Sequence, residues 1–205
     1  MAFPTTNAAQ ELPAVNEILA SVGQAPVTTL DQTNPDVAIA YDTLTNVSRE
    51  VQAEGWTFNT EEFYELTPDG NGEIVIANNI LQLDLHDEKD NQYETVRRNG
   101  KLYEKINHTY DWSTWDKVAC DIVWFFDWVD LPRPIQDYIT ARAATLVSSR
   151  IVGDAQQYQM LQAKEIQNRS MAMEYETRQG DYTFFGHAKG NKGYHSYQPY
   201  HALSR

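Results

Sequence analysis

Apolar residues near the N-terminus recur at intervals of three and four, which predicts two amphipathic helices. The first apolar stripe ends at Gly23 and consists of Leu12, Val15, Ile18, Leu19 and Val22. A second helix is predicted from Asn34, a good N-cap, with Pro35 at the first helical position and Asp36 beside the positive helix end. Its stripe continues through Val37, Tyr41, Leu44, Val47 and Val51. Gly55 is expected to end this helix.

From Trp56 onward the pattern changes to short β-branched and aromatic runs separated by turn residues, which predicts strands. The strongest signals are the turn Pro68–Gly72 and the hairpin dipeptide Asn99-Gly100. Extended segments are expected at Trp56 and Phe58, and at residues 62–66, 73–77, 81–85, 92–98, 101–109 and 118–129. Together they predict a meandering antiparallel sheet over residues 56–130.

Helical periodicity returns after Pro132 and Pro134. The apolar face of this third helix consists of Ile135, Tyr138, Ile139, Leu146, Val147 and Ile151. Gly153-Asp154 is typical of a helix end followed by a new cap, and a last helix is expected to run to about Gly180. Helices joined by so short a turn should pack antiparallel, and the two N-terminal helices should complete a bundle with them.

The predicted fold class is therefore α+β. An antiparallel helical bundle is expected from residues 1–55 and 131–180, with a β-rich subdomain inserted at residues 56–130. Residues 181–205 form an extended tail rich in glycine and aromatic residues, with three basic residues and one acid, Asp181. Such a tail cannot easily bury itself locally, so we expect it to order against a partner; a plain frayed terminus is the alternative. The predicted interface residues are Tyr182, Phe184, Phe185, Tyr194, Tyr197 and Tyr200.

Composition and charge restrict the function classes. The chain has 205 residues, of which 41% are hydrophobic, enough for a substantial core, and its formal net charge is −13. Free nucleic-acid binders usually carry the opposite sign, because they neutralise phosphates. An acidic wall beside DNA would instead keep the strand from sticking, although acidity for solubility is the commoner reason. The single cysteine, Cys120, excludes an intrachain disulfide and fits a reducing compartment.

We expect neither a membrane anchor nor an ordinary secretion signal. No apolar run approaches the ~20 residues needed to span a bilayer. The first residues, Met1–Thr6, lack a basic region and an apolar signal core.

Two acidic groups are candidate catalytic or metal sites. Glu54, Glu61, Glu62 and Glu65 suggest glycoside hydrolysis, which requires two carboxyls facing one cleft. Neighbouring strand residues point to opposite faces, so surface charge is the preferred interpretation. The second group, Asp84, His86, Asp87, Glu88 and Asp90, lacks the spacing of a calcium loop and is interpreted as a solvated turn.

The remaining reactive residues also give no site. His187, His195 and His201 match no compact zinc module. Cys120 lies among apolar residues, which is typical of an inert core thiol. No nucleophile elbow, P-loop or dinucleotide-type glycine motif occurs. We therefore predict no catalytic residue, no metal and no cofactor.

Three segments of the chain carry motifs of a known family. The segment from Ala14 to Val27, AVNEILASVGQAPV, resembles the first helix of tail tubular protein A, the adaptor or gatekeeper of short-tailed bacteriophages (podoviruses). Gly55–Asn59 (GWTFN) is similar to the entry into its sheet, and Met173–Glu176 (MEYE) to the end of its last long helix. The resemblance covers most of residues 10–180 and excludes the tail and the loop near residues 84–92.

This resemblance implies a subunit of a twelve-membered homo-oligomeric ring in the virion tail, assembled in the host cytoplasm. Its partners would be the portal protein and the six-fold nozzle, tail tubular protein B. Viral DNA would pass through the lumen without sequence-specific binding. Two alternatives remain: a virion-associated hydrolase of peptidoglycan or capsule glycan, and an assembly chaperone that leaves before maturation.

Overall fold

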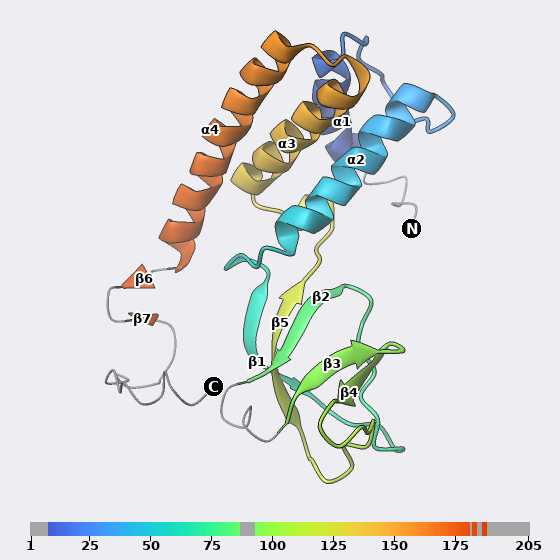
Figure 1. The fold of residues 1–205 in the computed structure, drawn as a ribbon, viewed down its shortest axis with the longest axis vertical. Coiled ribbons are helices and arrows are strands. Elements are labelled where there is room, and N and C mark those ends of the chain that lie inside the picture. Colours follow the sequence, from blue (N-terminus) through green and yellow to red (C-terminus); the bar gives the residue numbers. More distant parts are fainter. Residues whose placement is uncertain (1–7, 87–92, 181, 184–185, 188–205) are drawn as a thin grey trace. The chain divides into compact units, whose positions relative to one another are not determined.

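The computed structural model describes residues 8–86, 93–180, 182–183 and 186–187, shown as a ribbon in Figure 1. It confirms the α+β fold class, with helices α1–α4 and antiparallel strands. The chain divides into two compact units: one from Met1–Glu54 and Phe126–Glu176, the other from Gly55–Phe125 and Thr177–Arg205. No helix in the described ranges combines the length and apolar character needed to cross a bilayer.

The helix boundaries follow the capping residues of the sequence. Helix α1 (Ala8–Ser21) is followed by Gly23, and α2 (Pro35–Gln52) starts after Asn34, whose side chain accepts a 3.0 Å hydrogen bond from the backbone N–H of Asp36. Helix α3 (Arg133–Ile151) and α4 (Ala155–Gly180) are joined by a short turn. In that turn Gly153 has a positive φ, and Asp154 accepts from the backbone N–H of Gln156 at 2.8 Å. The predicted break at Gly153-Asp154 is confirmed.

The core of the helical unit is a bundle of three helices rather than four. Helices α1, α2 and α3 approach one another closely. Their fully or nearly fully buried side chains include Val15, Ile18, Leu19, Val37, Leu44, Val47, Val51, Ile135, Tyr138, Ile139 and Val147. Helix α4 runs antiparallel to α3 beside it, as predicted, but its backbone makes few close approaches to the other helices (Figure 1).

The β unit contains a three-stranded antiparallel sheet in the order β1-β5-β2, from β1 (Thr60–Leu66), β2 (Ile80–Leu85) and β5 (Val118–Trp124). A hairpin of β3 (Thr95–Arg98) and β4 (Lys101–Glu104) turns at Asn99-Gly100, as predicted. Two short strands, β6 (Tyr182–Thr183) and β7 (Gly186–His187), pair with each other.

Several predicted β segments were wrong in extent or arrangement. The sheet is not a meander, because the last of its strands, β5, lies between β1 and β2. Residues 73–77 contribute only a bridge from Val75 to Lys101, and the strand predicted to reach Thr109 ends at Glu104. The strand predicted for residues 118–129 ends at Trp124 and is followed by a 3-10 helix, Trp128–Asp130.

The core of the β unit forms around aromatic residues that lie outside its strands. Trp112 is fully buried and donates from its indole N–H to the backbone carbonyl of Leu102 at 3.1 Å. Its ring makes edge contacts with Trp115, which in turn meets Tyr93. The buried aliphatic residues around it are Ile74, Ile76, Ile80, Leu85, Leu102, Val118 and Ile122.

Two buried amide side chains hold the paired segments by which the chain enters and leaves the β unit. In the helical unit, Gln52 accepts from the backbone N–H of Phe126 at 2.8 Å and donates to its carbonyl at 3.1 Å. In the β unit, Asn59 accepts from the backbone N–H of Trp56 and donates to the carbonyl of Trp124, both at 2.8 Å. The Asn59 bond to Trp56 closes a turn where the sequence had predicted an extended segment.

Replacing Gln52 with leucine should destabilise the helical unit. The fully buried Gln52 side chain would no longer make its two hydrogen bonds to the Phe126 backbone, which costs roughly 1–3 kcal/mol. Urea unfolding followed by tryptophan fluorescence measures the change. Gln10→Leu, at an exposed position of α1, is the control and should shift the free energy of unfolding by less than about 0.5 kcal/mol. Equal midpoints for the two variants would contradict this role of Gln52.

Candidate assembly surfaces

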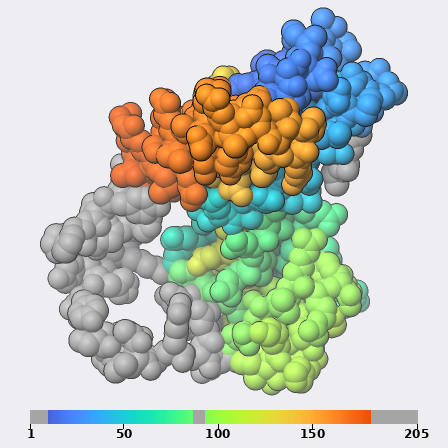
Figure 2. Space-filling model, turned by 45° about the horizontal axis from the view of Figure 1, so that its top comes forward, coloured from blue at the N-terminus to red at the C-terminus, as the bar shows by residue number. Residues whose placement is uncertain are grey.

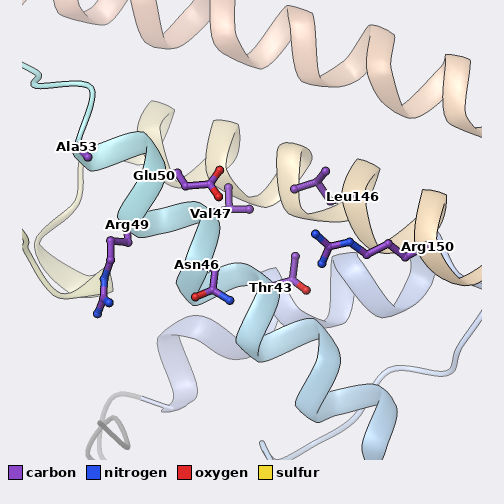
Figure 3. Close-up of a pocket in the computed structure, with 8 residues that line it drawn as sticks. All are labelled: Thr43, Asn46, Val47, Arg49, Glu50, Ala53, Leu146 and Arg150. Carbon is purple, nitrogen blue, oxygen red and sulfur yellow. The ribbon is translucent and has the colours of Figure 1, made fainter.

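A groove of about 480 Å³ lies between α2 and α3 in the helical unit (Figure 3). Leu146 of α3 and Ala53 form its accessible apolar part, above the almost fully buried Val47 and Thr43 of α2. The charged and amide side chains that line it are Asn46, Arg49, Glu50 and Arg150. The lining holds two arginines and one glutamate, Glu50, which pairs with Arg142 at 3.0 Å, so the formal charge of the lining is positive. The groove therefore suits an apolar ridge that carries hydrogen-bond acceptors.

Helix α4 is attached to the helical unit by long polar side chains. Lys164 pairs with Glu17 of α1 at 2.5 Å, and the side-chain amide of Gln157 donates to the backbone carbonyl of Ser21. Arg169 lies 3.8 Å from a carboxylate oxygen of Glu54 and faces the ring of Tyr138, 5.9 Å from its centroid. Besides these polar contacts, α4 buries Ala172 fully, so it is held mainly by long polar side chains and one small apolar contact.

The opposite side of α4 exposes large apolar side chains. Met160, Ile166 and Met171 are 64%, 61% and 54% exposed. Figure 2 shows α4, in orange, as an open surface along the helical unit. Single exposed apolar residues are ordinary, but several on one helix indicate a surface that another protein covers.

The carboxylates considered for glycan hydrolysis do not converge on a cleft. Glu61, Glu62 and Glu65 are exposed on β1, an edge strand of the sheet, where charges prevent pairing with another sheet edge. Glu65 forms an ion pair with Lys117. Glu54 lies instead in the helical unit, where Arg142 and Arg169 each approach it to 3.8 Å. These contacts support the interpretation of the four residues as surface charge.

A contact centred on His86 was missed from the sequence. The Nδ1 atom of His86 lies 3.0 Å from Asp121 Oδ1 on β5, and its ring lies 3.4 Å from the Phe63 ring, centroid to centroid. Phe63 has a φ of 60° at an irregularity of β1, and its backbone N–H donates to Asp121 at 3.0 Å. The interpretation of His86 as part of a solvated turn is therefore corrected. Of the other members of that group, Asp84 lies in β2, and Asp87, Glu88 and Asp90 lie outside the described residues.

The other reactive residues have no geometry for catalysis in the described ranges. Cys120 is buried, and desolvation with the nearby acids Asp121 and Asp84 raises the pKa of its thiol to about 12, so it stays protonated. Among the described residues, no cluster of three or more histidine, cysteine or acidic side chains is placed to hold a metal. His195 and His201 fall outside those ranges.

The predicted tail interface also falls largely outside the described residues. Tyr182 lies in β6, paired through its backbone with His187. Phe184, Phe185, Tyr194, Tyr197 and Tyr200 are outside the described ranges.

Comparison with known proteins identifies the family of this chain. Residues 12–182 match the family of tail tubular proteins, and this range includes the helices α2 to α4 and the strands β1 to β5. The chain belongs to the tail tubular protein family. It is also similar to tail tubular protein A of Klebsiella phage KP34, at 30% identity over 140 residues, which cover 65% of this chain and 70% of the relative.

Membership of the tail tubular protein family makes this chain a structural component of a bacteriophage tail. The surfaces that matter for such a component are those that contact other tail proteins. In the described part of this family member, the α2–α3 groove and the exposed side of α4 are the candidates.

One buried carboxyl group makes the helical unit of this tail tubular protein sensitive to pH. Glu11 of α1 is 2% exposed, and its Oε2 has no hydrogen-bond partner among the described residues. Burial and the nearby carboxylate of Asp127 raise the pKa of Glu11 from 4.5 to about 7, against a smaller opposing effect of a hydrogen bond from Tyr41. The ionised form therefore destabilises the fold.

The Glu11→Gln variant should be more stable than the wild type at pH 8, by up to roughly 3 kcal/mol, and by less than about 1 kcal/mol at pH 5. The folded protein holds the Glu11 proton between pH 4.5 and about 7 while the unfolded chain releases it, so wild-type stability falls as pH rises through that window. Urea unfolding at both pH values measures this difference. Glu17→Gln, at an exposed position of α1, is the control and should show no such gain at pH 8. An equal gain at both pH values would contradict the assignment.

Proposed function

We propose that this chain is a non-catalytic adaptor subunit of the tail, which forms a ring between the portal and the nozzle and lets viral DNA pass through its lumen. The observation that carries the proposal is the family match over residues 12–182. A ring of twelve copies and a nozzle built of tail tubular protein B are parts of the same proposal. Assembly would take place in the host cytoplasm, with the finished ring in the virion tail.

Two physical features support an adaptor. The helical unit has a groove and an exposed helix side, which are surfaces of the kind that subunits of an assembly use against one another. The net charge of −13 suits a channel past which DNA must slide, because like charges keep the phosphates from adhering to the wall.

A hydrolase is the less favoured alternative, because the candidate carboxylates are exposed on an edge strand or paired with arginines. Glycoside hydrolysis requires two carboxyls on either side of one sugar. The division into a helical body (residues 1–55 and 131–180), a β-rich insert (56–130) and a tail (181–205) remains part of the proposed organisation.

A cryo-EM reconstruction of the intact tail should place this chain at the joint between portal and nozzle, with its copies arranged in a ring. A position elsewhere in the particle would refute the adaptor, and absence from finished particles by mass spectrometry would favour a chaperone. Incubation of the purified protein with peptidoglycan or capsule should give no products. Reproducible products that disappear in Glu62→Gln would favour the hydrolase.

Deleting residues 181–205 should leave the helical unit folded but weaken assembly, because we propose that the aromatic tail binds a neighbouring subunit or the portal. The helical circular dichroism signal and the urea midpoint should stay within error of the wild type. Incorporation into particles, measured by quantitative mass spectrometry, should fall several-fold. Normal incorporation of the truncated protein would rule out this role of the tail.

A further inference from the structure

Eight positions of α4 form one continuous exposed face without a formal charge. They recur at steps of three and four, so they share one side of the helix over about 24 Å of its length. We name this side the outer face of α4, and it consists of Gln156, Gln159, Met160, Ala163, Ile166, Gln167, Ser170 and Met171, all exposed. A solvated helix side normally carries charged residues, and 22% of this chain is charged. The outer face thus differs from an ordinary solvent-facing surface.

The charged residues of the same stretch all lie on the other side of the helix. Lys164 pairs with Glu17, and Arg169 pairs with Glu54. The carboxylate of Glu165 stabilises the positive charge of Arg142. The charged residues of α4 between Ala155 and Met171 therefore interact with other residues of the helical unit. What remains outside is apolar side chains and amides, a combination typical of protein interfaces.

We propose that the outer face of α4 docks into the α2–α3 groove of a second copy of this chain, and that this contact closes the ring. The inference rests on the proposed ring function and assigns its subunit contact. A closed ring larger than a dimer needs two different surfaces on each subunit, one meeting the other on the next copy. The described part of the helical unit offers a ridge and a groove on different helices.

The chemistry of the two surfaces matches. Met160, Ile166 and Met171 supply apolar side chains that can pack on Leu146 in the groove (Figure 3). The glutamine amides of the outer face provide carbonyl acceptors for the guanidinium group of Arg150, which is exposed.

Charge favours a second copy as the occupant. Each copy carries −13, so two copies repel wherever their acidic surfaces meet, and a lateral contact requires surfaces that are neutral or positive. The outer face is neutral and the groove lining carries a net positive charge. The tail of the same chain is the competing occupant, but its excess of basic residues suits an acidic surface better than an uncharged one.

Charge placed on the outer face should prevent assembly without unfolding the subunit. In the double variant Met160→Glu/Met171→Glu, docking would bury two unpaired carboxylates, so subunit association should weaken roughly 100-fold. Native mass spectrometry and light scattering over a concentration series measure the association, and circular dichroism checks the fold. The matched control is Val75→Glu/Ile106→Glu, at residues that are 68% and 53% exposed in the β unit, and it should assemble like the wild type.

Disulfide trapping identifies the partner surface. Because Cys120 is buried, an engineered surface cysteine is the reactive thiol of each variant. Met160→Cys protein mixed with Asn46→Cys protein should give a cross-linked heterodimer under mild oxidation, which can only join different copies. Disulfide-linked dimers formed by Met160→Cys protein alone would overturn the docking of the outer face into the groove. An intrachain disulfide in the variant Met160→Cys/Tyr197→Cys would also overturn it, because the tail would then be the occupant of the outer face.

The outcomes separate this contact from the ring itself. If the wild type forms a closed oligomer and the charged outer-face variant does so equally well, the α4 contact is wrong and the ring stands. If the wild type stays monomeric at every concentration and the mixed cysteine variants do not cross-link, the proposed ring fails, and the contact with it.

Discussion

The fold depends on two buried amide side chains at the place where a β unit is inserted into a helical chain. An insertion brings two segments, distant in sequence, through one junction, and their backbone polar groups must be paired when buried. Gln52 and Asn59 provide that pairing with the backbone of Phe126 and Trp124. Both amides are almost fully buried, so each supplies a donor and an acceptor where water cannot. Each unit can then form its own core.

The helical unit combines close apolar packing with polar contacts between side chains. Close packing among α1, α2 and α3 buries their apolar stripes, whereas α4 is attached through Lys164, Arg169 and Gln157. Ion pairs between partly exposed groups contribute little stability, roughly 0–1 kcal/mol each. Helix α4 therefore adds less to the core than its length suggests. This explains why one side of α4 exposes apolar and amide side chains, which are suited to contact with another protein.

The β unit shows how acidic residues serve a structural protein without forming a site. The edge strand β1 carries exposed glutamates that protect it from pairing with other strands. Its irregularity at Phe63 is held by Asp121, which also binds His86. A single side chain thus fixes a strained backbone residue and the end of the neighbouring strand β2. This contact accounts for Asp121 and His86 without catalytic chemistry.

The sequence by itself determined the features that depend on neighbours along the chain. Asn34-Pro35 and Gly153-Asp154 set helix boundaries through backbone hydrogen bonds, and Asn99-Gly100 set the hairpin. Periodicity also separated helical from β-rich segments. Three short motifs indicated the tail tubular protein family, which the comparison then established.

Only the tertiary structure decided what depends on partners distant in sequence. Contacts between segments 35 or more residues apart determine three features of the β unit. These are the strand order β1-β5-β2, the end of β5 at Trp124 and the pairing of His86 with Asp121. The last helix was expected to pack in the bundle, yet its apolar residues Ile166 and Met173 are exposed. Periodicity shows which residues share a side of a helix and not whether that side is covered. Whether a helix side faces a core or solvent is a property of the packing.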